Sequence, residues 1–128
     1  MTPVRYPANP TVAAAGAVLT KALLRAAGLL GLSNAIVARV VGVSESHVSR
    51  MAKGERELEP GTKPAELAAL LLRVYRSLDA LVGNDERHRK EWMTSFNRAF
   101  NEAPKEAIQT VEGLARVARY LDGARALV

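Results

Sequence analysis

The chain has 128 residues, long enough for one domain or two small helical subdomains with a hydrophobic core. It contains no cysteine, which excludes disulfides, thiolate metal sites and cysteine nucleophiles and fits a reducing compartment. The net charge of +5 favours approach to a polyanion without identifying one. Ala, Leu, Val, Arg and Glu dominate, and no stretch alternates like a strand between hairpin turns. We therefore expect an all-α, cytoplasmic protein.

The first element expected is a long helix. Residues 1–10 include three prolines and are predicted to form a loose arm. A helix is predicted over residues 11–30, ended by Gly31. Lys21 and Arg25 interrupt its apolar sequence, so it is too short to span a bilayer and we expect a buried helix. Its apolar face is predicted to contain Val12, Ala15, Leu19, Ala22, Leu23 and Ala26.

Residues 33–54 predict two short helices joined by a tight turn, which is the DNA-binding helix-turn-helix. The first helix is expected from Asn34 to Val41. Gly42 suits the turn because a positive φ costs glycine little, and the Ser44 hydroxyl is placed to cap the second helix. The residues expected between the two helices are Ile36, Val37, Val40, Val43, Val48 and Met51, with Ala38 at the crossing and Gly54 ending the second helix.

The outward side of the second helix is polar and basic. Short hydroxyl side chains with arginine, lysine and histidine suit base edges and phosphates in a major groove. Two copies on a repeated DNA site are expected, because the modest charge of one copy predicts modest affinity. A structural hairpin, with Arg50 and Lys53 as solvated charges, is the alternative. The predicted DNA-binding residues are Ser33, Asn34, Ser44, Ser46, His47, Ser49, Arg50 and Lys53.

A polar connector follows the helix-turn-helix, and its prolines and glycine break helices. We predict a subdomain border near residue 60. Residues 1–60 would then hold the arm, the first helix and the helix-turn-helix, and residues 61–128 a helical C-terminal subdomain. Pro64 suits the start of a long helix ending near Val82. Its stripe of Leu67, Leu70, Leu71, Val74, Leu78 and Leu81, widened by Leu72 and Tyr75, predicts core packing, with a dimer surface as the alternative.

Three further helices are predicted after a turn at residues 83–85, where Asp85 can cap the next helix. The first runs from Glu86 to Asn101, with Trp92, Met93, Phe96 and Phe100 on one side. Pro104 then opens a short helix to Ile108, and Thr110 caps the last helix. That last helix is expected to bury Leu114, Val117, Ala118, Leu121 and Leu127, and Gly113 is suited to close helix approach.

Enzymatic activity is not expected. His47 and His88 belong to different predicted helices without metal-ligand spacing, and a phosphate-binding glycine loop and a serine elbow are missing. The run DERHRKE around His88 predicts a mesh of surface charges. We predict no catalytic residue, no metal, no cofactor and no contact with a membrane.

Residues 92–121 resemble the C-terminal toxin-binding region of Xre/MbcA/ParS-type antitoxins. In that family a Trp-containing helix, a small loop, a proline-started short helix and a glycine-containing final helix follow one another, usually behind an Xre-like helix-turn-helix. The resemblance covers about residues 30–125. Asn101 stands near a position where the family often has glycine, and asparagine can adopt the same left-handed turn. The matching residues are Trp92, Asn97, Phe100, Pro104, Ile108, Gly113, Val117 and Leu121.

The resemblance implies an antitoxin that blocks the active site of a RES-type toxin, an NAD⁺-degrading protein, and represses its own operon. A homodimer within a toxin–antitoxin hetero-oligomer is expected. Aromatic and arginine side chains anchor protein interfaces, although core packing is the alternative for each aromatic. Arg125 and the chain end are hypothesised to reach into the toxin pocket. The predicted toxin-binding residues are Trp92, Phe96, Phe100, Pro104, Arg116, Arg119, Tyr120 and Arg125.

Two other functions compete with this interpretation. One is a free-standing transcriptional regulator whose C-terminal half dimerises or senses a ligand, although no polar ligand pocket is evident. The other is a protein-binding helical module that no longer binds DNA.

Overall fold

In the computed structural model, which describes residues 10–127, the chain is all-α, as predicted, and this part contains no strand. Residues 1–9 of the predicted arm and the side chain of Val12 lie outside the described part. Pro10, the last residue of that predicted arm, already belongs to the first helix. No helix within residues 10–127 is long and apolar enough to cross a membrane. The helices are α1 (Pro10–Leu29), α2 (Asn34–Val41), α3 (Glu45–Ala52), α4 (Lys63–Val82), α5 (Glu86–Thr94), α6 (Pro104–Ala107) and α7 (Val111–Ala126).

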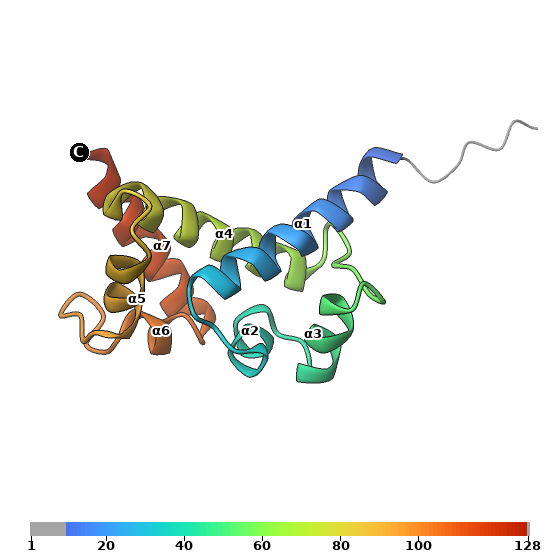
Figure 1. Cartoon of the computed structure of the whole chain (residues 1–128), viewed down its shortest axis with the longest axis horizontal. Coiled ribbons are helices and arrows are strands. Elements are labelled where there is room, and N and C mark those ends of the chain that lie inside the picture. The colour runs from blue at the N-terminus through green and yellow to red at the C-terminus, as the bar shows by residue number, and fades with distance from the viewer. Residues whose placement is uncertain (1–9, 128) are drawn as a thin grey trace, which may run out of the picture.

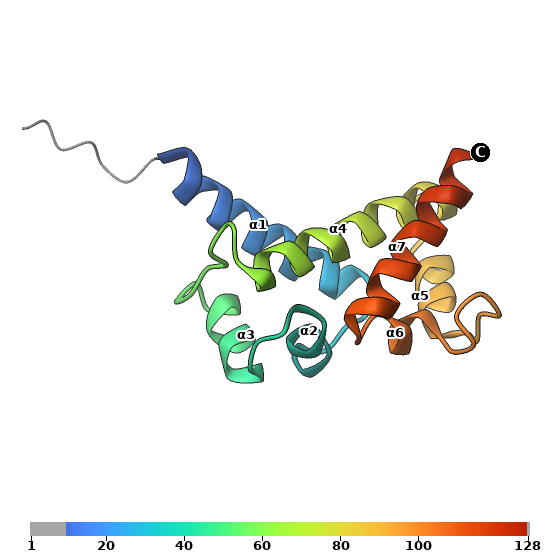
Figure 2. The same cartoon turned by 180° about the vertical axis from the view of Figure 1, so that it is seen from behind.

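The long helix α4 joins the two ends of the molecule. It packs against α1 and α2 on one side and against α7 and α5 on the other, and both views show it extending between these groups (Figures 1 and 2). Its residues Leu71, Val74 and Leu78 are completely buried in a core cluster that includes side chains of both groups. The predicted core stripe of α4 is therefore confirmed, whereas the border near residue 60 remains a prediction.

Side-chain caps begin most of these helices. Ser44, Asp85 and Thr110 accept hydrogen bonds from the backbone N–H three residues ahead, as the sequence predicts. Ser33 and Thr62 cap α2 and α4 in the same way. These bonds satisfy backbone donors that a helix start leaves without an intrahelical acceptor, so the helix starts follow from local sequence.

The buried face of α1 differs from the predicted one. Ala15 is exposed, whereas Thr20 is only 4% exposed. The Thr20 hydroxyl donates to the Gly16 carbonyl at 2.7 Å and accepts from the Leu58 N–H at 2.8 Å. The connector after α3 thus hydrogen-bonds to α1 through a buried threonine, a contact that apolar periodicity alone does not predict.

The predicted helix from Glu86 to Asn101 is wrong beyond Thr94, where α5 ends. Residues 95–103 form a loop in which the Asn97 N–H donates to the Glu102 carbonyl at 3.1 Å. The Asn97 side chain also accepts from the Ala99 N–H at 3.0 Å. An asparagine side chain that bonds the backbone two residues ahead competes with helix formation. Asn101 adopts the expected left-handed conformation with φ of 57°.

Candidate functional site

Helices α2 and α3 form the predicted helix-turn-helix. Gly42 lies between them with φ of 75°, a conformation that glycine adopts without strain. The N–H groups of Gly42 and Val43 both donate to the Ala38 carbonyl, at 2.9 and 3.1 Å. Val48 is completely buried and Met51 nearly so. The predicted apolar contact between the two helices is confirmed, and it fixes the outward face of α3, which we call the reader helix.

The structure leaves most predicted DNA-binding residues at the surface. Ser46, Arg50 and Lys53 are exposed on the reader helix or at its end. Asn34, Ser33 and Ser44 are exposed as well, and both serines use their hydroxyls as helix caps. His47 and Ser49 are half-buried. The exposed residues form a polar, cationic face, and its contact with DNA remains a prediction.

His47 occupies an unusual position on the reader helix. Its Nε2 atom is buried and has no hydrogen-bond partner among the described residues. Burial lowers the pKa of His47 below the ordinary value of 6.5, and the charges of Arg56 and Arg50 lower it further. The ring lines a cavity of about 510 Å³, together with Arg56, Glu57, Leu58, Glu59, Thr62 and Pro64.

Arg56 is a candidate that the sequence reasoning missed. Its side chain is exposed, and its charge acts on His47 of the reader helix. Arg56 lies in the connector after the reader helix, between Glu55 and Glu57. These two acidic neighbours make the local net charge negative, so the sequence does not mark this segment as basic. The fold places Arg56 beside His47 of the reader helix, at a cavity that Glu57 and Glu59 also line.

Three rings from distant segments form what we call the aromatic ridge: Trp92, Phe100 and Tyr120. The centroids of Trp92 and Phe100 are 6.2 Å apart, and those of Phe100 and Tyr120 are 5.2 Å apart, both in edge-to-face arrangements. Phe100 is 5% exposed and Tyr120 is 44% exposed. The core-packing alternative therefore applies to Phe100, and in part to Trp92, which is half-buried and packs against the core cluster.

Phe96 has the opposite environment to Phe100, although the sequence places both on one helical face. It is 66% exposed because the chain leaves the helix at Thr94. The ring lines a cavity of about 320 Å³ with Val82, Trp92 and Asn97 among its walls. An exposed phenylalanine on a hydrogen-bonded loop is a ready anchor for another protein, because little conformational entropy is lost when it binds.

The start of α7 packs tightly against α6. A Cβ atom on Gly113 would lie 1.9 Å from the Ala107 carbonyl oxygen, so the predicted close approach at this glycine is confirmed. Pro104 is buried, and it begins α6 as predicted. As with Phe100, its burial points to support of the site and leaves little surface for a partner.

The remaining predicted contacts lie along α7. Arg119 and Arg125 are exposed, and Arg116 pairs with Glu112 at 3.0 Å. Leu114, Val117, Ala118 and Leu121 are completely buried, as predicted. Leu127 is 89% exposed, so its predicted place in the core is wrong. The helix end extends beyond the surface that α4 covers.

A polar contact holds the last turns of α7 against α4. The Asp122 carboxylate accepts from Ser77 at 2.8 Å and from Arg73 Nε at 2.6 Å. The hydrogen bond from Arg73 lowers the pKa of Asp122, burial opposes this, and the bond from Ser77 lowers the pKa again. This contact positions the turn of α7 that carries Arg125.

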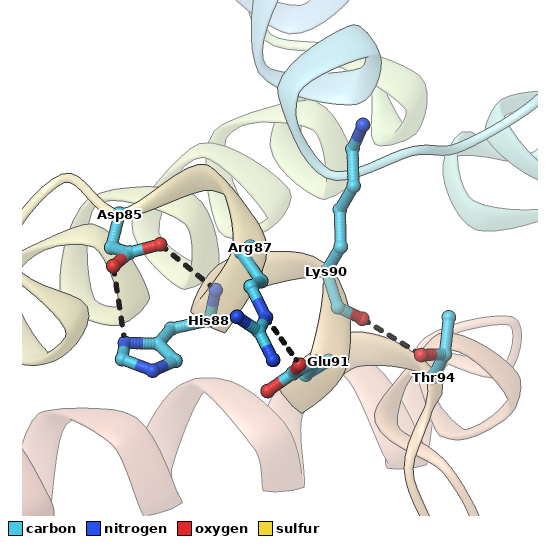
Figure 3. A network of polar contacts seen from close by, with 6 residues as sticks. All are labelled: Asp85, Arg87, His88, Lys90, Glu91 and Thr94. Atoms are coloured by element: carbon cyan, nitrogen blue, oxygen red, sulfur yellow. Dashed lines mark hydrogen bonds and ion pairs between the residues drawn. The ribbon is translucent and has the colours of Figure 1, made fainter.

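The charged run on α5 has the predicted character, with one exception. Arg87 pairs with Glu91 at 3.1 Å and His88 lies beside Asp85, as Figure 3 illustrates. All four side chains are exposed. Arg89, by contrast, is 2% exposed. Within residues 10–127, no group of three or more His, Cys, Asp or Glu side chains could hold a metal ion.

Arg89 connects three segments from its buried position. Its guanidinium group pairs with Asp79 at 2.9 Å, reaches the Leu29 carbonyl at 3.5 Å and lies 5.6 Å from the centre of the Tyr75 ring. The predicted surface mesh is therefore wrong for this residue. The position of Arg89 along α5 does not predict its burial, because its acceptors come from the ends of α1 and α4.

Two family models match the chain. The model described as the antitoxin Xre-like helix-turn-helix domain matches residues 12–73. The model described as the antitoxin Xre/MbcA/ParS C-terminal toxin-binding domain matches residues 77–126. No curated protein matches the chain. The first match includes nearly all of α1 as well as the helix-turn-helix, and the second includes the aromatic ridge and the whole of α7.

Proposed function

The chain belongs to the Xre-type antitoxins, and we propose that it neutralises a RES-type, NAD⁺-degrading toxin and represses its own operon. The observation that carries the proposal is the presence of two exposed surfaces of different chemistry on one core. The reader helix presents a polar, cationic face, and the other end presents exposed aromatic and arginine side chains. Such a protein can hold DNA and a protein partner together in the cytoplasm.

The DNA surface consists of Ser46, Arg50 and Lys53, extended by Arg56. Arginine reads guanine through paired hydrogen bonds in the major groove, and lysine suits phosphate. Ser33 and Asn34, at the start of α2, contact the sugar-phosphate backbone. His47 and Ser49 sit at the edge of this surface, and the Ser44 hydroxyl serves chiefly as a cap.

The toxin surface combines Trp92, Phe96 and Tyr120 with the arginines of α7. The exposed rings of Phe96 and Tyr120 and the half-buried ring of Trp92 supply apolar area. Arg116, Arg119 and Arg125 supply hydrogen bonds at its border. Phe100 and Pro104 hold these side chains in place from inside the domain. In this proposal the end of α7 enters the toxin active site and excludes its substrate.

Repression requires two reader helices on one operator, so we propose a homodimer within the toxin–antitoxin assembly. The outer side of α1 supports this proposal, because Val18 is 65% exposed beside the exposed Ala14 and Ala15. Sedimentation of the purified chain tests it. A monomer at micromolar concentration, with or without operator DNA, contradicts the dimer.

Co-expression with the neighbouring reading frame tests the function. We expect the product of that frame alone to arrest growth and to lower cellular NAD⁺, and we expect this chain to reverse both effects. A gel shift on the upstream DNA tests repression separately. Growth arrest without NAD⁺ loss would contradict the RES assignment, and the absence of any relief would contradict antitoxin function.

A further inference from the structure

Gly123 lies in the last turn of α7, where the described residues give no structural reason for a glycine. A Cβ atom added there would meet no atom within 4 Å among the described residues. At Gly113, by contrast, the added atom would overlap the Ala107 carbonyl. Glycine inside a helix is less stable than alanine because it loses more backbone entropy on folding. The isolated fold therefore explains one glycine of α7 and leaves the other unexplained.

The surroundings of Gly123 are those of a contact surface. One turn earlier lie Arg119, which is exposed, and Tyr120, the outer ring of the aromatic ridge. One turn later lies Leu127, at 89% exposure. Residues three and four apart share a helix face, so the bare backbone of Gly123 lies between an aromatic and an aliphatic side chain. This surface is continuous with the ridge, and all of it except Leu127 lies within the span of the toxin-binding family model.

We propose that a main-chain segment of the cognate toxin packs directly on α7 at Gly123, between Tyr120 and Leu127. Glycine allows two backbones to approach more closely than any side chain permits. The occupant is the toxin because the ridge that borders this surface belongs to the toxin-binding domain. The inference rests on the proposed function and adds the point at which the backbones of antitoxin and toxin come closest.

The test uses two substitutions of different size and a matched control. Gly123→Ala has room in the free chain, and because Gly123 is exposed the longer side chain of Gly123→Leu can extend into solvent. Alanine and leucine have similar helix propensities. The control is Gly28→Ala, at a helical glycine of α1 where an added Cβ also meets no atom within 4 Å. The probe is the purified product of the adjacent toxin gene, inactivated by substitution, titrated calorimetrically against the full chain.

We expect Gly123→Ala to weaken toxin binding about tenfold and Gly123→Leu about a hundredfold, because the added atoms separate the two backbones. Both alanine variants should raise the thermal midpoint by about 2–6 °C. Gly28→Ala should bind the toxin within about twofold of the parent chain.

Two results would overturn the inference while leaving the proposed function intact. One is parental affinity in both Gly123 variants. The other is an equal loss with alanine and leucine, because that pattern would indicate a need for helix flexibility rather than space. If the parent chain itself fails to bind the toxin, the proposed function fails, and the inference fails with it.

Discussion

Arg39 of α2 donates a hydrogen bond to the side-chain oxygen of Gln109, 3.0 Å away and 70 positions further along the chain. The contact joins the helix-turn-helix to the turn between α6 and α7. Arg89 makes a second connection, from α5 to the Leu29 carbonyl at the end of α1. The DNA-binding and toxin-binding domains of this antitoxin therefore share polar contacts as well as the core around α4. For a substitution on either surface, both DNA binding and toxin binding should therefore be measured.

Arg50→Ala should weaken operator binding by about 1–3 kcal/mol if the guanidinium group reads a guanine. Its side chain is exposed, so we expect no change in stability or in toxin neutralisation. Quantitative gel shifts and the growth assay measure the two activities. Simultaneous loss of both would indicate unfolding and would leave no support for a specific DNA contact.

Arg56→Ala should reduce operator affinity uniformly across sequences and lower the slope of log affinity against log salt by about 1, as expected for one lost phosphate contact. Arg76→Ala is the control, because Arg76 is an exposed arginine on α4, outside the proposed DNA surface. Fluorescence anisotropy across a salt series gives the slope. An unchanged slope in Arg56→Ala would remove Arg56 from the DNA surface.

Phe96 and Phe100 form a matched pair with opposite expectations. Phe96→Ala should leave stability nearly unchanged, because the ring is 66% exposed, and should weaken toxin binding by about 2 kcal/mol. Phe100→Ala should destabilise the fold by about 3–5 kcal/mol, because it empties a buried site between two rings. Urea unfolding and calorimetric titration with the toxin separate these effects. Full toxin affinity in Phe96→Ala would exclude it as an anchor.

Arg89→Ala should destabilise the chain by about 2–4 kcal/mol, because it removes a buried guanidinium group and leaves Asp79 without its partner. Arg87→Ala, on the same helix, should cost less than about 0.5 kcal/mol, since its pair with Glu91 is exposed to solvent. Chemical denaturation of both variants provides the comparison. Equal effects would mean that burial of Arg89 contributes little to stability.

The lowered pKa of His47 predicts a pH dependence of stability. Between the folded pKa and the ordinary value of 6.5, the unfolded chain binds more protons, so the free energy of unfolding rises with pH. The His47 contribution is complete above about pH 6.5 and declines as the pH falls toward the folded pKa. His47→Gln should make the free energy of unfolding less dependent on pH in this range. Titration of the His47 ring by NMR gives the pKa directly, and a value above 6.5 would reverse the sign.

The sequence by itself determined the helix-turn-helix and most helix ends. Gly42, Ser44, Asp85 and Thr110 act on backbone groups within three or four residues, so their effects can be read locally. The apolar periodicity of α4 and α7 likewise predicted which sides are buried, apart from the helix end at Leu127.

Tertiary structure decided which of two phenylalanines faces outward and which arginine of a charged run is buried. Phe100 packs between rings from α5 and α7, and Arg89 finds acceptors at the ends of α1 and α4. These rings and acceptors lie 8 to 60 positions away from Phe100 and Arg89 in the chain. Burial of a side chain depends on all the segments that meet around it, whereas a helix cap depends only on the next turn. Helix caps, whose partners are close in sequence, could therefore be predicted, whereas the burial of Phe100 and Arg89, whose partners are distant in sequence, could not.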